Sequence, residues 1–132
     1  MSFNHLVVWL DHRQAHIIFF NAELSESRVI QSKAAQTHIH HKSGSVGSGH
    51  SSGDQNFYHE IVQSFGPTKE VLIVGPGSAK LELIKHVHQH DATIAKKIIG
   101  IETVDHPTDG QLLAFAKKYF QKADNLIGDT NI

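Results

Sequence analysis

Residues 71–87 read VLIVGPGSAKLELIKHV, and this stretch decides the fold. The apolar run EVLIV at 70–74 is typical of a strand that is buried on both faces of a sheet. A tight turn at 75–78 follows, and the pattern then changes to the spacing of a helix over 79–90. A strand that leads directly into a helix predicts a crossover connection and parallel strand pairing. Side chains on related faces of this helix are Leu81, Ile84, Lys85 and His88.

The chain before this stretch predicts a different kind of pairing. HLVVWL at 5–10 and AHIIFF at 15–20 are rich in β-branched and aromatic residues, and ESRVIQS at 26–32 is a weaker run of the same kind. Short polar segments separate the three runs. We therefore expect an antiparallel meander of three strands.

Two further helices and one further strand complete the predicted elements. Phe57, Ile61, Val62 and Phe65 stand at helical spacing, and either Ser52 or Asp54 can be the N-cap of their helix, with Gly66-Pro67 at its end. A short segment at 91–96 leads to a last strand at 97–104. Thr108 and Gln111 fit a capping box that opens the final helix. The apolar stripe of that helix is Leu112, Leu113, Phe115, Ala116, Tyr119 and Phe120.

The order of these elements, β-β-β-loop-α-β-α-β-α, predicts an α/β fold with a mixed five-stranded sheet flanked by helices. The length of 132 residues fits one domain, which we place at 1–124 with a long polar loop at 34–53. We expect residues 125–132 to be a frayed tail.

Composition narrows the classes of function. Lys and Arg number 12 against 13 Asp and Glu, so bulk charge does not predict a protein that coats nucleic acid, and we expect no DNA partner. There is no cysteine, which excludes disulfides and thiolate metal sites. No secretory signal or membrane-length apolar run is visible, so we expect a soluble cytoplasmic protein. The composition does not predict an oligomeric state.

Residues 38–55, HIHHKSGSVGSGHSSGDQ, form the most unusual stretch of the chain. Its residues 38–53 belong to a longer region, 27–53, that has no acidic residue. Glycines allow a backbone to approach a partner closely, and Lys42 with the nearby histidines can offer positive charge to phosphates. A disordered linker and a metal site are the alternatives.

Histidine spacing leaves the metal alternative open. His38 and His40 lie on the same side of an extended strand, and His50 or His12 can supply a third imidazole for Zn²⁺. The histidines His86, His88 and His90 on one predicted helix are better explained as partners of the helix dipole.

Acidic residues raise one more alternative, since metal-dependent nucleases gather carboxylates from strand ends. Asp11, Glu102, Asp105 and Asp109 are the candidates, but Asp109 fits a first-turn acid and no Asp lies where the middle strands end. Asp11-His12-Arg13 is either a phosphate-contacting tip, through Arg13, or a turn in which Asp11 binds its own backbone. We expect Trp9 in the core.

The predicted order of elements matches a ribonuclease H-like motif, and two stretches carry a closer likeness. VLIVGPGSAKLELIKHV and NFYHEIVQSF (56–65) resemble the strand, turn and helices of the central domain of archaeo-eukaryotic peptide-chain release factors and Pelota. The chain is also similar to small bacterial proteins labelled "translational machinery protein". The segments that recur in those proteins include WLDHR, HHKSGSVGSGH, DQNFYHE and VDHPTDGQL.

The resemblance implies a role in translation. Release factors carry a Gly-Gly-Gln tripeptide in the loop before the corresponding helix, whereas this chain has Gly47-Ser48-Gly49-His50 there. We therefore expect binding to the ribosome or tRNA through the loop rather than release-factor catalysis. If the protein does hydrolyse peptidyl-tRNA, His50 has to replace the missing Gln. The residues expected to contact RNA are Arg13, Lys33, His38, His40, His41, Lys42, Gly44, Gly47, Gly49 and His50. A bound cofactor is not expected, and Zn²⁺ held by His38, His40 and His50 is the alternative.

Overall fold

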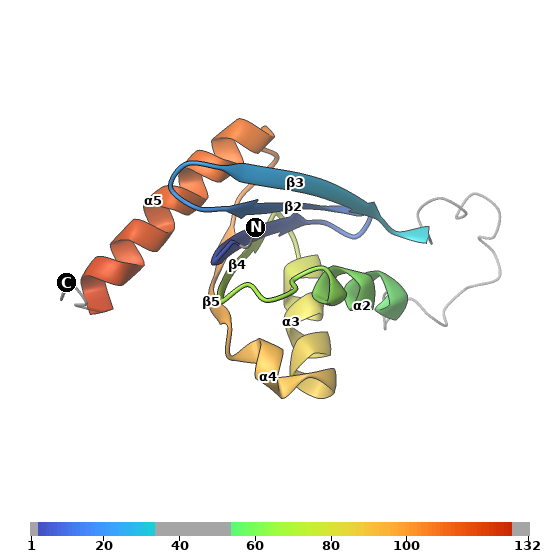
Figure 1. Ribbon diagram of the computed structural model, residues 1–132. Coiled ribbons are helices and arrows are strands. Elements are labelled where there is room, and N and C mark those ends of the chain that lie inside the picture. The colour runs from blue at the N-terminus through green and yellow to red at the C-terminus, as the bar shows by residue number, and fades with distance from the viewer. Residues whose placement is uncertain (1–2, 34–53, 128–132) are drawn as a thin grey trace, which may run out of the picture.

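The protein forms a five-stranded mixed sheet with helices on both faces (Figure 1). The computed structural model describes residues 3–33 and 54–127. The strands are β1 (His5–Leu10), β2 (Gln14–Phe20), β3 (Ser25–Gln31), β4 (Glu70–Gly75) and β5 (Ile98–Thr103). The helices are α2 (Gln55–Gln63), α3 (Ala79–His90), α4 (Ala92–Ala95) and α5 (Asp109–Ile127).

Strand pairing confirms both halves of the prediction. The order across the sheet is β3-β2-β1-β4-β5. Pairs β1–β2 and β2–β3 are antiparallel, whereas β1–β4 and β4–β5 are parallel. The meander therefore occupies one side of the sheet, and the crossover connection from β4 through α3 and α4 to β5 builds the other side.

Strand β4 is buried on both faces, as its apolar run predicts: Val71, Leu72, Ile73 and Val74 are inaccessible to solvent, and Gly75 is buried. It lies between β1 and β5 in the sheet, and helices cover both of its faces. Alternation along β1 divides its side chains between the two layers. Leu6, Val8 and Leu10 pack toward α2 and α3, while Val7 and Trp9 pack toward α5.

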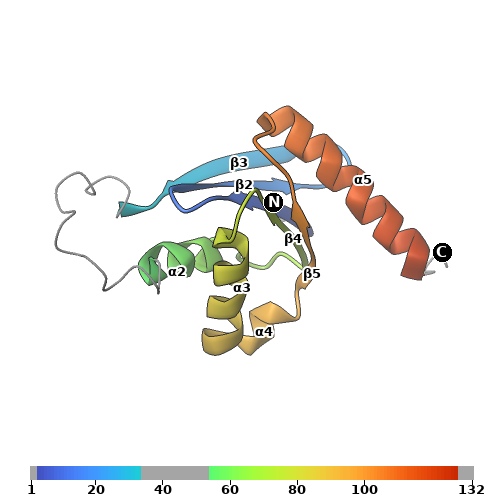
Figure 2. The same cartoon turned by 180° about the vertical axis from the view of Figure 1, so that it is seen from behind.

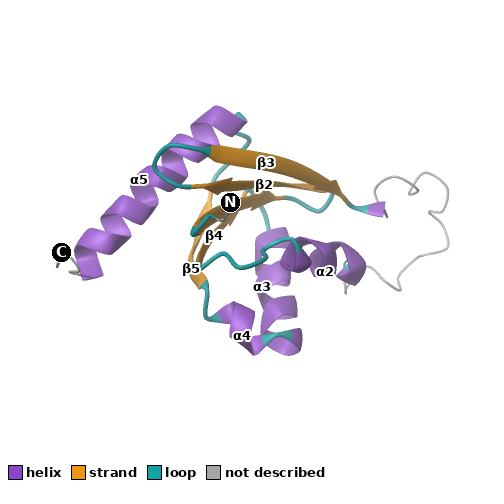
Figure 3. Cartoon of the chain, viewed as in Figure 1, coloured by secondary structure: helices purple, strands orange, loops and turns teal. Residues whose placement is uncertain are grey.

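Figures 1 and 2 show α2, α3 and α4 on one face of the sheet and α5 alone across the other. The larger core cluster contains Phe57, Tyr58, Ile61 and Phe65 with residues of α3. The second cluster is built on Leu112, Ala116 and Phe120 of α5. Figure 3 shows how little of the described chain lies outside helices and strands.

The helices differ from the sequence prediction in three details. Helix α4 is a four-residue turn where we expected only a connecting segment. Helix α5 extends to Ile127. On α3 the residues that face the core include Ala79, Leu83, His86 and Val87. Of the apolar residues that we expected on related faces, Ile84 is partly buried against the core, whereas Leu81 is 55% exposed. The buried residues Ala79, Leu83 and Val87 recur every four positions and have small or branched side chains. The apolar residues Leu81 and Ile84 led us to expect a different face.

Candidate functional site at the carboxyl edge of the sheet

The parallel strands β1, β4 and β5 all end at one edge of the sheet, which we call the carboxyl edge. In sheets of this kind the residues just beyond the strand ends usually form the ligand site. Here that edge receives the β1–β2 turn at 11–13, the turn at 75–78 and the segment 104–108. The end of β3 reaches the same edge, because Gln31 pairs with Gln14 at the start of β2.

The β1–β2 turn is held by Asp11. Its Oδ1 accepts hydrogen bonds from the backbone N–H groups of Arg13, at 2.8 Å, and Gln14, at 3.0 Å. This is the Asx-type turn that was one of the two interpretations of the segment. The side chains of His12 and Arg13 remain exposed at the tip. The backbone of the turn is therefore held in place, and it displays the cationic side chain of Arg13 at the carboxyl edge.

Ser32 and Asp54 join the two ends of the segment that connects β3 to α2. The Ser32 side chain is buried, and its hydroxyl donates to Asp54 Oδ2 at 2.6 Å. The Ser32 N–H also donates to the Arg13 carbonyl at 2.9 Å. Asp54 Oδ1 accepts from the Phe57 N–H at 3.1 Å, so Asp54, and not Ser52, is the N-cap of α2. The described residues on either side of the segment 34–53 are therefore joined at one point, which we call the Ser32–Asp54 stem.

Two of the predicted RNA-contacting residues lie beside this stem. Arg13 is exposed at the tip of the turn, and Lys33 is exposed directly after Ser32. The remaining candidates lie outside the described residues, and they are His38, His40, His41, Lys42, Gly44, Gly47, Gly49 and His50. Both described cations are therefore close to the start of the segment that contains the other candidates: Lys33 directly precedes it, and the backbone of Arg13 is hydrogen-bonded to Ser32.

Glu82 of α3 connects α2 to the β1–β2 turn. Its Oε1 accepts the Tyr58 hydroxyl at 2.7 Å, and its Oε2 lies 3.3 Å from His12 Nε2. Burial raises the pKa of Tyr58 well above its usual range, and the hydrogen bond to Glu82 and the charges of Glu82 and Asp54 raise it further. The Tyr58 hydroxyl therefore remains a proton donor at every physiological pH and serves to position Glu82.

The turn after β4 is built by a lysine and a glycine. Lys80 is buried to 7% exposure, and its Nζ donates to the Gly77 carbonyl at 2.5 Å. At Gly75 a Cβ would collide with the backbone carbonyl of Leu10. Strands β1 and β4 are therefore packed closely together at their carboxyl ends, with no room for a side chain at position 75.

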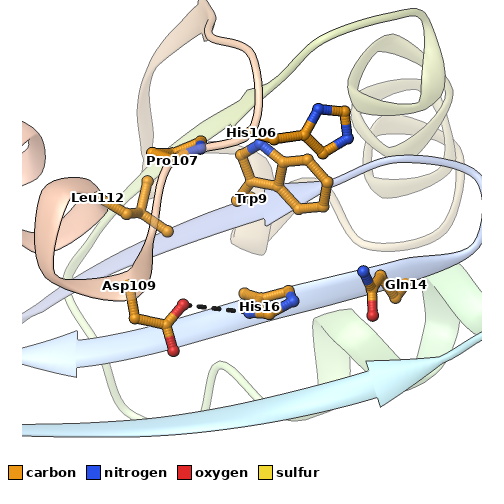
Figure 4. Close-up of a pocket in the computed structure, with 7 residues that line it drawn as sticks. All are labelled: Trp9, Gln14, His16, His106, Pro107, Asp109 and Leu112. Atoms are coloured by element: carbon orange, nitrogen blue, oxygen red, sulfur yellow. Dashed lines mark hydrogen bonds and ion pairs between the residues drawn. The ribbon is translucent and has the colours of Figure 1, made fainter.

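A pocket of about 180 Å³ opens on the α5 side of this edge (Figure 4). Trp9 and Leu112 form its buried floor, at 4% and 2% exposure. His16 Nδ1 lies 3.1 Å from Asp109 Oδ1 on one side, and His106 lies on the other, with its ring centroid 5.0 Å from that of Trp9. Gln14 and Pro107 complete the lining. Trp9 is in the core, as expected, but it also faces this pocket.

The Trp9 ring is fixed by a hydrogen bond between the ends of two strands. Its Nε1–H donates to the Asp105 carbonyl at 2.6 Å. The helix that follows begins with the predicted capping box, because Thr108 N–H donates to Gln111 Oε1 at 2.9 Å and Gln111 N–H donates to Thr108 Oγ1 at 3.1 Å. Asp109 is the first-turn acid of α5, as expected.

One histidine of α3, His86, differs from the expectation, whereas His88 and His90 lie in the last turn of the helix. His86 is not an exposed partner of the helix dipole; its side chain is buried between α3 and α2, with Nδ1 2.6 Å from Gln55 Oε1. The rings of His90 and His59 lie 4.5 and 6.3 Å from it. Burial lowers the pKa of His86, and the charges of His90 and His59 lower it further. His86 is therefore a neutral packing residue.

The carboxylates proposed for a nuclease site do not converge. Asp11 binds its own turn, Asp109 pairs with His16, and the Asp105 side chain is 93% exposed. Within residues 3–33 and 54–127 no group of three or more His, Cys, Asp or Glu side chains is arranged to hold a metal ion. In the same part of the chain, no helix has the length and apolar character needed to cross a membrane.

Comparison with solved structures shows where else this fold occurs. The Pelota protein of Thermoplasma acidophilum superposes with a TM-score of 0.62 at 15% identity, over 84% of this chain and 31% of that one. Pelota of Archaeoglobus fulgidus gives 0.63 at 13% identity, over 98% and 35%. An archaeal translation termination factor gives 0.50 at 12% identity, over 96% and 41%.

These likenesses show a release-factor-like α/β fold and confirm that part of the sequence prediction. The chain spans about a third of the length of the two Pelota proteins. No protein-family model matches the sequence, and no curated protein matches it significantly.

Proposed function

We propose that this protein binds the translation apparatus and contacts ribosomal RNA or tRNA through the acid-free segment that begins and ends at the Ser32–Asp54 stem. The observation that carries the proposal is the fold, which two Pelota proteins and an archaeal translation termination factor share. We also propose, on the sequence resemblance alone, that the protein is bacterial and cytoplasmic and that its fold has a ribonuclease H-like motif. We propose neither a DNA partner nor a membrane partner.

The charges at the stem support this choice of partner. Arg13 and Lys33 are exposed next to it, and no acidic residue occurs between 27 and 53. Lysine and arginine side chains bind phosphate oxygens in RNA without regard to sequence. The glycines at 44, 47 and 49 let the main chain approach those phosphates, and His38, His40, His41 and His50 can stack on unpaired bases.

Co-sedimentation with ribosomes tests the proposal directly. We expect the full chain to pellet with ribosomes, and a variant with a short Gly/Ser linker in place of 34–53 to remain in the supernatant. Arg13→Ala, Lys33→Ala and Lys42→Ala should each weaken binding and lower its salt dependence by about one phosphate contact. The matched control is Lys117→Ala on the exposed side of α5, which should bind like the parent. Equal pelleting of the linker variant and the parent would refute the role of the segment.

The termination-factor likeness favours a second candidate, hydrolysis of peptidyl-tRNA. In that case His50 aligns the attacking water in place of the glutamine of the Gly-Gly-Gln tripeptide. The test is a peptidyl-tRNA hydrolysis assay of the parent and of His50→Ala. Loss of activity in the variant supports the enzyme, while no activity in the parent leaves the binding protein.

The histidine spacing supports a zinc protein as a third candidate, with His38, His40 and His50 as the ligands. Metal analysis of untagged protein, with a thermal shift on added Zn²⁺, tests it. Substitution of His38 should abolish both signals if the site exists.

A further inference from the structure

We propose that the pocket between Trp9, His16, His106 and Asp109 binds the ring of one unstacked, amino-bearing nucleobase. This inference rests on the proposed function, because an RNA partner would be the source of the base. The pocket lies wholly in described residues, and none of its residues is among those expected from the sequence to contact RNA.

The floor of the pocket is suited to a flat ring. Trp9 belongs to the core cluster under α5, and Leu112 packs in the same cluster. The hydrogen bond from Trp9 Nε1–H to Asp105 fixes the indole in place before any ligand arrives. His106 lies over one side of it with 55° between the ring planes, and its own side chain is 63% exposed. Its Nδ1 lies 3.0 Å from Asp105 Oδ1, so the imidazole is held beside the indole. The two rings together offer a planar ligand the kind of aromatic contact that proteins make with single-stranded bases.

The size of the pocket selects a single ring system. Its volume of about 180 Å³ is below the roughly 300–1,000 Å³ typical of sites for whole cofactors and drug-sized ligands. A base can enter, but its sugar and phosphate must stay outside. Outside is also where a phosphate belongs, because the carboxylate of Asp109 stands at the rim and repels anions.

The polar groups at the rim select the type of base. Asp109 is about half exposed and uses Oδ1 for His16, while a carboxylate has acceptor sites for further donors. The Gln14 side chain adds one donor and one acceptor group. Acceptors beside a stacking surface fit the exocyclic amino groups of adenine, guanine and cytosine, and uracil has no such group.

The pocket is also close to the stem. Gln14, at its rim, pairs with Gln31, and the next residue, Ser32, binds Asp54. Trp9 pairs with His16 across the same end of the β1–β2 hairpin. Since the stem and the pocket share the carboxyl edge, an RNA strand that contacts Arg13 and Lys33 can reach the mouth of the pocket, where one base can leave the stack and enter.

Trp9 is the only tryptophan of the chain and reports on the pocket directly. We would titrate the full-length protein with AMP, GMP, CMP and UMP while recording tryptophan fluorescence and the indole N–H signal by NMR. We expect saturable changes with the first three and much weaker ones with UMP and with ribose 5-phosphate. His106→Ala should weaken binding about tenfold, the effect of losing one stacking partner, and Asp109→Asn should weaken it about threefold. His88→Ala, an exposed histidine far from the pocket, should bind like the parent, and circular dichroism should show all three variants folded.

Titration with short single-stranded RNA then tells whether the bound base belongs to RNA or to a free nucleotide. Tighter binding of the RNA than of the mononucleotides, with the same loss in His106→Ala, supports an RNA base in the pocket. Binding of mononucleotides alone overturns the RNA source and leaves a free-nucleotide site. An unchanged Trp9 signal, or equal quenching in the parent and both pocket variants, overturns the pocket itself.

Ribosome co-sedimentation distinguishes this inference from the proposed function. If ribosomes bind the parent and both pocket variants equally and nucleotides leave the Trp9 signal unchanged, the pocket inference fails and the proposed function stands. If nucleotides bind at Trp9 and ribosomes do not bind at all, the proposed function fails and the pocket remains a base site.

Discussion

At the scale of single residues, Gly75 shows how closely the chain is packed at the carboxyl edge. Its backbone lies against the Leu10 carbonyl, whereas Gly77, two positions later in the same turn, has open space where a Cβ would go. Neither glycine has a positive φ, so the two positions differ in space and not in backbone conformation.

We predict that Gly75→Ala lowers the free energy of unfolding by about 1–3 kcal/mol, the usual cost of forcing extra volume into a packed site. Gly77→Ala, the matched control, should change it by less than about 0.5 kcal/mol. Urea denaturation of both variants measures the difference. Equal stability of the two would mean that β1 and β4 can separate at their ends at little cost.

Asp54 is a residue with two structural roles, because one carboxylate oxygen caps α2 and the other receives Ser32. We predict that Asp54→Ala lowers the free energy of unfolding by about 2–3 kcal/mol, since both the cap and a buried hydrogen bond are lost. Ser32→Ala should cost less, about 1–2 kcal/mol, because the cap remains. Denaturation curves of the two single variants and the double variant give their coupling. Additive effects would contradict a shared role.

At the scale of elements, the interface between α2 and α3 contains a buried imidazole. In the folded protein burial lowers the pKa of His86, with the charges of His90 and His59 acting in the same direction. The unfolded chain therefore binds this proton more readily, and low pH favours unfolding. The groups that face His86 are Gln55, Tyr58 and His59 from α2 and His90 from its own helix.

We predict that this histidine makes the protein less stable as the pH falls below its ordinary value of about 6.5. The contribution is complete above that pH and is lost as the pH approaches the lowered pKa of the folded state. His86→Gln should flatten the pH dependence of the midpoint of thermal unfolding between about pH 7.5 and 5.5. The exposed His88→Gln should follow the parent, and a His86→Gln curve that does so as well would show that His86 has no such effect.

The elements themselves were largely predictable from local pattern. Strand β1 at His5–Leu10 and helix α3 at Ala79–His90 have the predicted bounds, because an apolar run or a helical repeat ends at a turn residue in each case. The buried face of α3 was not predictable in the same way. Its row contains Lys80 and His86, which are buried through hydrogen bonds and not through apolarity.

The candidate site was only partly predictable, for a reason of topology. The sequence indicated Arg13 and the segment after β3, since charge and glycine content are local properties. The pocket combines Trp9 and His16 with Asp109, which lies 93 residues from His16 in the chain. The β1–β2 hairpin pairs the first two, but only the path of α5 across that face brings the third to them. The position of α5 on the sheet cannot be predicted from a local sequence pattern.

At the scale of the whole molecule, the fold is two helical layers on a sheet, interrupted between β3 and α2 by the segment at 34–53. Closing a connection costs conformational entropy that grows slowly with its length, by about 0.6 kcal/mol for each doubling. The direct Ser32–Asp54 hydrogen bond shows that the ends need no long connection to meet.

We predict that replacing residues 34–53 by about five Gly/Ser residues raises the free energy of unfolding by about 1 kcal/mol while abolishing ribosome binding. Thermal and chemical unfolding measure the first effect, and co-sedimentation measures the second. A marked loss of stability would show instead that the segment contributes packing of its own.

The two roles of Asp54 also have a mechanical consequence. A pulling force on the chain just before Asp54 is resisted by the two hydrogen bonds of the Asp54 carboxylate. One of them closes the stem with Ser32, and the other caps α2. Pulling that carboxylate outward would release the first turn of α2, and with it Gln55, the neighbour of His86 in the interface with α3. If a bound partner pulled on the segment before Asp54, the interface between α2 and α3 would therefore be disrupted first. That interface lies on the opposite side of the sheet from α5.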